Sequence, residues 1–240
     1  MLRHNSRWVL LVPLIPVVFI AACDFDDHTP VGPVQNEPVS IDRGGVERAN
    51  IELKMGAGEM KLRGGASKLI DGTFEYNIPQ WKPLVDTSIN GTHATVTISQ
   101  PEHFRFGGGR RHYIWDLQLN DKVLTDLILN CGAGRAQLDL GDLTLRDIEV
   151  HMGAGQVDLD LRGQPTHDYD VSISGGVGQA TVYLPQGVGI WAQAHGGLGS
   201  ITVTGLDKQD DHWQNNLYDN SKVNVRLKVD GGIGQIRIIA

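Results

Sequence analysis

Residues 131–161 read CGAGRAQLDLGDLTLRDIEVHMGAGQVDLDL, and this stretch contains Gly-Ala-Gly twice, 21 residues apart. After each copy, apolar and polar residues alternate, with Ala136 and Leu138 apolar in the first copy and Val157 and Leu159 apolar in the second. Strict alternation with a period of two is typical of a strand that has one buried face, and not of a helix. The stretch therefore predicts two equivalent strands that each follow a glycine corner.

The motif recurs along the chain. Six segments align on the glycine pair, and four of them follow one another at intervals of 21 to 23 residues. The paired glycines are Gly56 and Gly58, Gly132 and Gly134, Gly153 and Gly155, Gly176 and Gly178, Gly197 and Gly199, and Gly232 and Gly234. A unit of this length cannot bury its apolar face alone, but stacked copies share one core, with equivalent residues paired in parallel about 4.8 Å apart. We therefore predict an all-β protein, a β-solenoid of stacked coils, each two or three short strands separated by Gly-x-Gly corners.

A glycine-rich loop after a strand can also hold a phosphate group. A dinucleotide-binding loop needs Gly-x-Gly-x-x-Gly followed by a helix. Here the third glycine is replaced by Gln137 and Asp158, and another strand follows in each case. No Lys-Ser or Lys-Thr pair follows, so the P-loop pattern fails as well. We interpret the glycine pairs as corners that need a positive φ angle and close stacking, with no cofactor bound.

Residues 66–125 interrupt the repeat after its first unit. Alternation predicts three strands, and Asn90-Gly91 is typical of a hairpin turn; the strands are Thr73–Tyr76, Ala94–Gln100 and Tyr113–Leu119. We interpret this part as an inserted antiparallel β cap that seals one end of the stack. A second insertion, the polar residues 205–221, explains the longer interval before the last coil.

Five residues are candidates for an interaction surface: Trp81, Arg110, Arg111, Trp115 and Trp213. Exposed aromatic side chains and arginines are favoured contacts in interfaces. The two arginines belong to a basic, glycine-rich loop at 103–115, which also contains Arg105. This loop is either a mobile hairpin tip or a contact for an anion or a lipid headgroup.

No constellation typical of catalysis or of metal binding stands out. His151 and His195 share one repeat position two coils apart, about 10 Å by strand spacing, which is too far for a common metal ion. Cys131 occupies an inward position and is expected to be a small buried hydrophobe. Asp139 and Asp160 stack in neighbouring coils, where they form either a solvated face or a weak calcium site. We therefore predict no catalytic residue, no metal site and no enzyme activity.

The N-terminus predicts export. Arg3 and Arg7 precede a short apolar run at 8–22 that is too short to span a membrane comfortably, a pattern typical of a secretory signal. The tetrapeptide at 20–23, Ile-Ala-Ala-Cys, resembles a bacterial lipobox and so implies cleavage before Cys23 and acylation of its thiol, whereas an ordinary signal peptide would make this cysteine incidental. Asp24 slightly favours retention at the periplasmic face of the inner membrane, with the outer membrane or the cell surface as alternatives. Because the mature chain is acidic, nucleic acid is not an expected partner.

These features divide the chain into four parts. Residues 1–22 form the signal peptide, 23–47 the acylated cysteine and a flexible, proline-containing tether, 48–125 the first coil with the β insertion, and 126–240 the solenoid repeats.

The order GTFEYNIPQWKP, then WDLQLND, then repeated LxxGAGxxxLDL resembles the toast-rack family of bacterial envelope proteins over roughly residues 48–240. It is also similar to the C-terminal domain of LiaF-type cell-wall-antibiotic-response proteins and to adhesin-head domains of stacked-β type. The resemblance implies a β-solenoid with a role in envelope sensing or interaction, and no catalytic residues to carry over. LiaF-type relatives bear transmembrane helices before this domain, whereas a lipid would replace them here.

Three functions follow from these observations. The first is a non-enzymatic, lipid-anchored envelope scaffold that acts in an envelope-stress or cell-wall response and binds another envelope protein or a second copy of itself. The second is a glycan-binding or adhesin-like surface module, and the third is a polysaccharide-active β-helix enzyme, which the mostly uncharged outward residues disfavour. The last coil ends with residues 235–240 and no polar cap segment follows them, so we expect the C-terminal end of the stack to be covered by a partner, by a second copy or by the loop 205–221.

Overall fold

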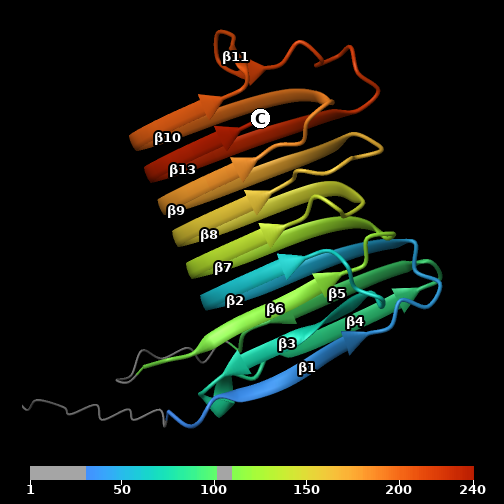
Figure 1. Cartoon of the computed structure of the whole chain (residues 1–240). Coiled ribbons are helices and arrows are strands. Elements are labelled where there is room, and N and C mark those ends of the chain that lie inside the picture. Colours follow the sequence, from blue (N-terminus) through green and yellow to red (C-terminus); the bar gives the residue numbers. More distant parts are fainter. Residues whose placement is uncertain (1–30, 102–109) are drawn as a thin grey trace, which may run out of the picture.

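The computed structural model describes residues 31–101 and 110–240, and within them the chain is a long mixed β-sheet wound into a stack (Figure 1). The strands are β1 (Gln35–Ile41), β2 (Arg48–Arg63), β3 (Ile70–Tyr76), β4 (Leu84–Asn90), β5 (His93–Ser99), β6 (Tyr113–Leu119), β7 (Leu124–Asp139), β8 (Leu145–Asp160), β9 (Tyr169–Tyr183), β10 (Gly189–Thr204), β11 (Asp207–Lys208), β12 (Trp213–Gln214) and β13 (Asn224–Ile239). The helical content of the described residues is one 3-10 turn, η1 (Pro79–Trp81). The predicted all-β solenoid is confirmed.

Each coil contains one long strand that bends at its glycine pair, not the two or three short strands expected from the repeat. In β7 and β8 the first arm precedes the corner and the second arm follows it, and equivalent residues pair in parallel along both arms, for example Leu129 with Val150 and Leu138 with Leu159. The strand continues through the corner because Gly-x-Gly changes direction without breaking the pairing to the neighbouring coils. The arms therefore form two facing sheets with a shared interior.

The second glycine of each pair permits both the bend and the stacking. All six have positive φ angles between 133° and 154°. A Cβ atom added to Gly178 would lie 1.8 Å from the carbonyl oxygen of Gly155 in the coil below, a distance no side chain can adopt. Successive corners therefore stack main chain on main chain, which is the geometric role the sequence predicts.

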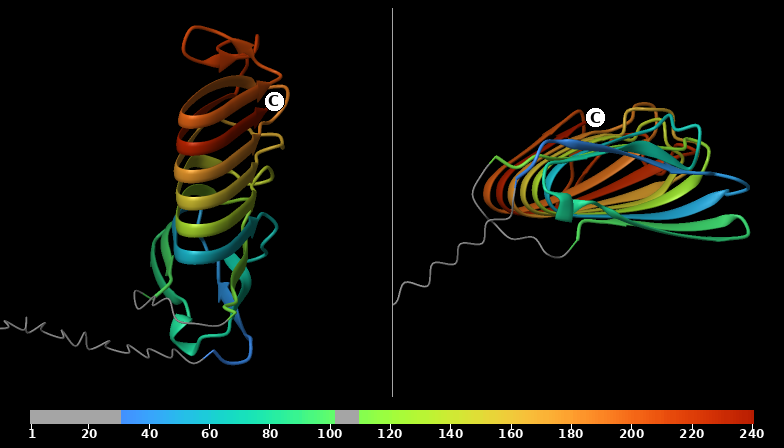
Figure 2. Two further views of the ribbon diagram at one scale, coloured as in Figure 1. Left: turned by 90° about the vertical axis from the view of Figure 1, so that its left-hand side faces the viewer. Right: turned by 90° about the horizontal axis from the view of Figure 1, so that it is seen from below.

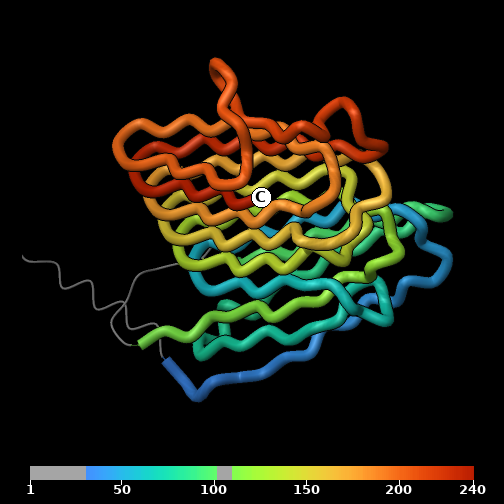
Figure 3. The backbone as a smooth tube through the Cα atoms, turned by 45° about the horizontal axis from the view of Figure 1, so that its top comes forward, coloured from blue at the N-terminus to red at the C-terminus, as the bar shows by residue number. Residues whose placement is uncertain are grey.

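The order of the coils in space differs from their order in the sequence. The solenoid runs β2-β7-β8-β9-β13-β10, so the last strand, β13, lies between β9 and β10 (Figure 3). The expectation that the C-terminal strand forms the end of the stack is therefore wrong. The chain skips one position after β9, forms β10, and returns through residues 205–223 to fill the gap. The end of the stack is β10.

The N-terminal region continues both sheets of the solenoid. The first arm of β2 pairs with β5, and β5 with β4, whereas the second arm of β2 pairs with β6, followed by β3 and β1. Figure 2 (left) shows these two extensions diverging below the stacked corners. An aromatic core fills the space between them. The rings of Trp115 and Phe74 pack edge to face with centroids 5.4 Å apart, and those of Trp81 and Tyr113 do so with centroids 5.6 Å apart.

Part of the expected tether is folded. Residues 35–41 form the edge strand β1, paired with β3 in antiparallel register from Gln35–Tyr76 to Ile41–Ile70. Proline is tolerated in an edge strand because its missing N–H group can face away from the ladder, and Pro38 lies in such a strand. Val39 points into the core at 9% exposure.

Candidate interaction surfaces

Two of the predicted interaction residues are not on the surface. Trp81 is 2% exposed and Trp115 is fully buried, so neither can contact a partner directly, and the prediction for these two is wrong. Trp115 shares the period-two face of β6 with Leu117 and Leu119, which are both buried. This alternation was visible in the sequence and indicates the core.

The other three residues lie at opposite ends of the molecule. Arg110 is exposed, and its carbonyl accepts a hydrogen bond from Nδ2 of Asn77 at 2.9 Å, while Arg111 lies over the ring of Trp81 at 5.5 Å. Trp213 is half-buried in β12, where Lys208 lies 5.8 Å from its ring, at the β10 end of the stack. The five residues therefore form no common surface. Arg105 and Cys23 lie outside the described residues.

The two histidines point outward and Cys131 points inward, as predicted, but the distance between the histidine strands differs from the prediction. His151 and His195 both point outward, but because β13 lies between their coils they are three strands apart instead of two. His151 Nδ1 lies 2.7 Å from Oγ of Ser174, and His195 lies 3.3 Å from Asp230. Cys131 is buried, and burial raises the pKa of its thiol to about 11.

One of the two stacked aspartates, Asp160, is paired with an arginine. Asp160 is opposite Asp139 as expected, but Arg162 binds the Asp160 carboxylate through Nε at 2.9 and 3.0 Å, which holds the pKa of this carboxyl below its usual value. Among the described residues, no group of three or more histidine, cysteine or acidic side chains could hold a metal ion. A guanidinium group at this position opposes cation binding, which favours the solvated-face alternative.

The outer face of the first arm carries stacked charges. Asp126, Asp147 and Asp170 occupy equivalent positions in β7, β8 and β9, followed by Arg226 of β13 and Trp191 of β10. Arg226 Nε donates to Asp170 at 2.6 Å, and Arg146 pairs with Asp126. Burial, followed by the neighbouring carboxylates of Glu149, Asp170 and Asp126, raises the pKa of Asp147.

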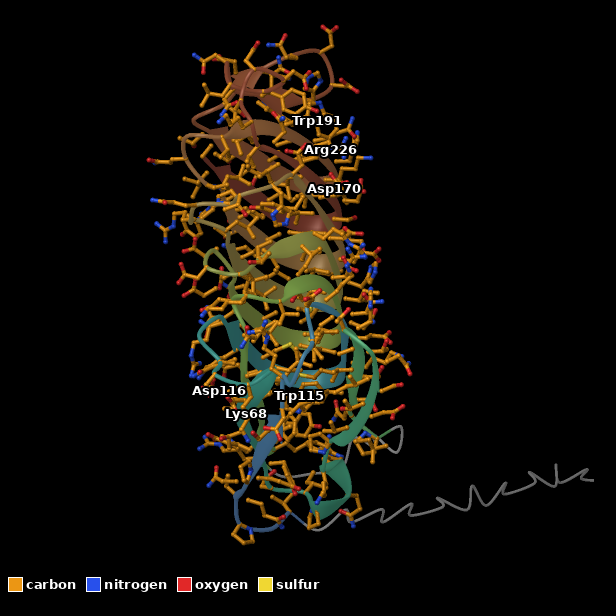
Figure 4. All side chains as sticks on the ribbon, turned by 90° about the vertical axis from the view of Figure 1, so that its right-hand side faces the viewer. Lys68, Trp115, Asp116, Asp170, Trp191 and Arg226 are labelled. Atoms are coloured by element: carbon orange, nitrogen blue, oxygen red, sulfur yellow. The ribbon has the colours of Figure 1, made fainter. Side chains whose placement is uncertain are left out.

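A groove near this face contains a tryptophan that the sequence interpretation did not single out. The groove has a volume of about 620 Å³ and is lined by Trp191, Tyr218, Arg226 and Asp170 among others. Trp191 stacks on the ring of His212, with the ring centroids 5.4 Å apart. Trp191, Arg226 and Asp170 lie one below another along the stack (Figure 4). Trp191 is half-buried. In the sequence, this placement is indicated by its position in the outward series of the first arm, with Gln193 and His195.

The β10 end of the stack is only half covered. On the first arm, β12 pairs with Trp191 and Ala192, and Ile190 exchanges main-chain and side-chain hydrogen bonds with Asn215. Within residues 31–101 and 110–240, no strand pairs with β10 from residue 195 onward on the side away from β13. We call residues 195–204 the open edge; all are exposed except Val203, which is half-buried.

An apolar cavity lies inside the corner next to the open edge. It has a volume of about 220 Å³ and is bounded by β8, β9, β13 and β10, including Met152, Ile173, Val229, Ile236 and Ile201. We call it the corner cavity. The inward residue before the first corner glycine is Met55, Cys131 or Met152 in the first three coils, but Gly175, Gly231 or Gly196 in the last three. Because glycine has no side chain, these three positions leave the corner cavity unfilled.

A stacked-coil β module with two open-ended sheets is the class that this geometry defines, and the comparisons agree. The family model for the N-terminal domain of toast_rack matches residues 30–183, and the model for the C-terminal part of LiaF, the cell wall-active antibiotics response protein, matches residues 133–238. The chain belongs to the toast-rack family.

A solved structure supports the same assignment. A candidate cell adhesion protein from Clostridium sporogenes ATCC 15579 is 30% identical to this chain with a TM-score of 0.83, over 86% of this chain and 99% of that one. A candidate adhesin from Bacteroides fragilis NCTC 9343 is 10% identical over 87% of this chain and 98% of that one, with a TM-score of 0.29. No curated protein matches the chain.

Proposed function

We propose that the chain is a non-enzymatic module of the bacterial cell envelope, anchored by a lipid on Cys23, that binds another envelope protein through its stacked β structure. The observation that carries this proposal is the uncovered apolar end of the stack, where Leu198 is 70% and Ile201 is 38% exposed. Soluble proteins normally cover such an end with a polar cap. The LiaF-type match and the relative described in terms of cell adhesion are consistent with an envelope or surface location.

The anchor is tested in the full chain expressed in a bacterium. We expect the wild type in the membrane fraction and labelled by an alkynyl fatty acid, and the Cys23→Ala variant unlabelled. No helix in the described part of the chain is long and apolar enough to span the membrane. Membrane association of an unlabelled wild type would contradict the lipid anchor.

Binding to another protein is tested by site-specific photo-crosslinking in intact cells. A photoreactive residue at Leu198 should give discrete products containing a second protein, whereas the same residue at Ser88, exposed on β4 at the other end of the stack, serves as the control. Products that are equal at both positions, or that are absent at Leu198, would contradict a partner at the uncovered end.

A glycan-binding function is the second candidate, and the groove beside Trp191 favours it. An aromatic ring next to arginine and aspartate side chains can stack on a sugar and bind its hydroxyl groups. Binding of purified peptidoglycan fragments or lipopolysaccharide should be lost in Trp191→Ala and kept in Trp213→Ala. Equal binding by both variants would exclude the groove.

A further inference from the structure

We propose that the open edge and the corner cavity together form a docking site for one extended strand of another protein, with an apolar side chain of that strand seated in the cavity. This inference deepens the proposed function and rests on it, because it names where and how the envelope partner binds. It follows from the main chain of β10, the composition of its edge, the cavity and the hairpin beside them.

The main chain of the open edge offers unused hydrogen-bonding groups. Thr204 accepts a hydrogen bond from the N–H of Ala240 at 3.0 Å, so its main-chain groups face β13. In a parallel pair the main-chain groups of successive residues point to opposite sides of the strand. Those of Ile201 and Val203 therefore point away from β13, toward the position of a next strand. A strand edge of this kind is a template for pairing with another chain.

The composition of the edge selects the chemistry of the partner. Residues 196–204 read GGLGSITVT and contain no charged residue, in a chain with a formal charge of −7. Natural edges that avoid pairing carry charges, proline or bulges, as β1 does with Glu37 and Pro38. The partner strand that fits is uncharged on its inward face, with aliphatic or aromatic residues at alternate positions to cover Ile201 and Val203.

The corner cavity provides a place for an anchoring side chain. At about 220 Å³ it is larger than an engineered cavity of about 150 Å³ that holds benzene, but smaller than the pockets of about 300–1,000 Å³ that hold drug-sized ligands. It thus has room for one large apolar side chain. In strand addition, main-chain hydrogen bonds supply affinity and such pockets supply specificity.

The hairpin at the end of the stack favours a single strand over a second solenoid. β12 pairs with the first arm of β10, and β11 pairs with β12, so this hairpin stands on the end surface above one arm (Figures 1 and 2). A second coil would need the edges of both arms, and the hairpin occupies one. The second arm remains open to one strand.

The position of the edge also agrees with the proposed anchor. Strand β1, the first strand of the described chain, lies at one end of the molecule, and β10 lies near the opposite end (Figure 1). A chain held to a membrane through Cys23 would therefore present the open edge on the side away from its anchor.

The test uses the mature full-length chain and a synthetic peptide with the sequence of residues 229–239, VDGGIGQIRII, because β13 already pairs with β10 in this register on its other side. We expect saturable binding of the labelled peptide and new protection of the Ile201 and Val203 amides from hydrogen exchange. A scrambled peptide of the same composition is the control.

Two variants separate the edge from the cavity. Ile201→Lys places a charge in the interior position of the edge, and Thr202→Lys places the same charge on the outer face of the same strand. Gly175→Met fills the corner cavity from β9, two strands away from the edge, where an added Cβ atom would have its nearest neighbour, the Met152 carbonyl oxygen, at 3.7 Å. We expect Ile201→Lys and Gly175→Met each to weaken binding at least tenfold and Thr202→Lys to change it less than threefold, a tenfold change being about 1.4 kcal/mol.

The possible outcomes decide the proposal. No saturable binding at about 1 mM peptide, or equal effects of the two lysine variants, would overturn it. A dimer of the chain alone, dissociated by Ile201→Lys, would overturn it in favour of a second copy. Unchanged binding by Gly175→Met would overturn the role of the cavity. Absence of peptide binding together with discrete crosslinked products at Leu198 in intact cells would overturn the strand-docking mode and leave the proposed function standing.

Discussion

At the scale of single residues, the glycines of the corners have two different roles. In β9, Gly178 has a φ angle of 150° and stacks directly on the main chain of Gly155, whereas a Cβ atom added to Gly175 would make only an ordinary contact with the Met152 carbonyl oxygen at 3.7 Å, and Gly175 lines the corner cavity. Glycine is required at position 178 by the bend and the stacking of the main chain, whereas glycine at position 175 leaves part of the corner cavity unfilled. The same residue type thus determines the fold at one position and a candidate site three residues earlier.

This difference predicts opposite effects of alanine in one strand. Gly178→Ala combines a backbone conformation that costs about 1–3 kcal/mol for a residue with a side chain with a clash against the Gly155 carbonyl, so we expect it to lose at least about 3 kcal/mol of stability. Gly175→Ala should be neutral or stabilising by up to about 1 kcal/mol, because it also restricts the unfolded chain. Denaturant unfolding of both variants measures the difference, and similar midpoints would contradict the assigned roles.

The carboxyl group of Asp147 predicts a pH-dependent stability effect. Its pKa is raised in the folded protein, first by burial and then by Glu149, Asp170 and Asp126. The folded state therefore binds more protons than the unfolded state just above the unfolded pKa of 3.8, and stability falls as the pH rises through this window. Asp147→Asn should stabilise the protein at neutral pH by less than about 1 kcal/mol, and the gain should vanish near pH 3.

Urea unfolding at the two pH values checks this expectation. Asp170→Asn is the matched control, because Asp170 accepts hydrogen bonds from Arg226 and its loss should destabilise the protein at neutral pH. A gain from Asp147→Asn that is the same at both pH values would show that its charge is not the cause.

At the scale of elements, the sequence predicts individual strands better than their neighbours. Alternation located β6 with its observed bounds, because every second residue from Tyr113 to Leu119 is a large apolar side chain buried in the core. It missed β1, where Pro38 and polar residues hide an edge strand with one face in contact with the core. The repeat gave the parallel register between coils, yet it could not show that β13 lies between β9 and β10, because near-identical repeats can exchange positions without changing their pairing pattern.

The candidate surfaces were harder to predict for a related reason. Aromatic content suggested Trp81 and Trp115, but exposure depends on what covers each face, and two diverging sheets enclose these rings. The change from Met152 to Gly175 at equivalent positions was visible in the sequence. Its consequence, a cavity, depends on whether neighbouring side chains fill the space, which is a property of the packed stack.

The inserted position of β13 predicts an unusual effect of truncation. Removing residues 224–240 would leave the facing edges of β9 and β10 both unpaired and would expose the interior beneath them, so we expect the C-terminal coils to unfold and to be cleaved by proteases between 184 and 223. Removing residues 207–214 takes away only the end hairpin, and the remaining coils should stay folded. Limited proteolysis with circular dichroism distinguishes the two, and equal resistance of both truncated chains would contradict the strand order.

At the scale of the whole molecule, the fold is a one-dimensional stack whose ends differ. Each coil contacts only its two neighbours, so stability is expected to depend on position along the stack. The N-terminal end diverges into two sheets around an aromatic core, and the β10 end closes over one arm only. The weakest part of the solenoid should therefore be the second arm of β10.

Hydrogen exchange gives a direct measurement of this gradient. Amides in β7 and β8, which are paired on both sides, should exchange slowest, because their opening requires disruption of the stack. Within β10, peptides from 189–194 should be more protected than peptides from 198–204, since β12 and Asn215 cover the first arm alone. Equal protection of the two arms in the isolated chain would mean that something already covers the open edge, and a measurement of mass in solution would then show whether it is a second copy.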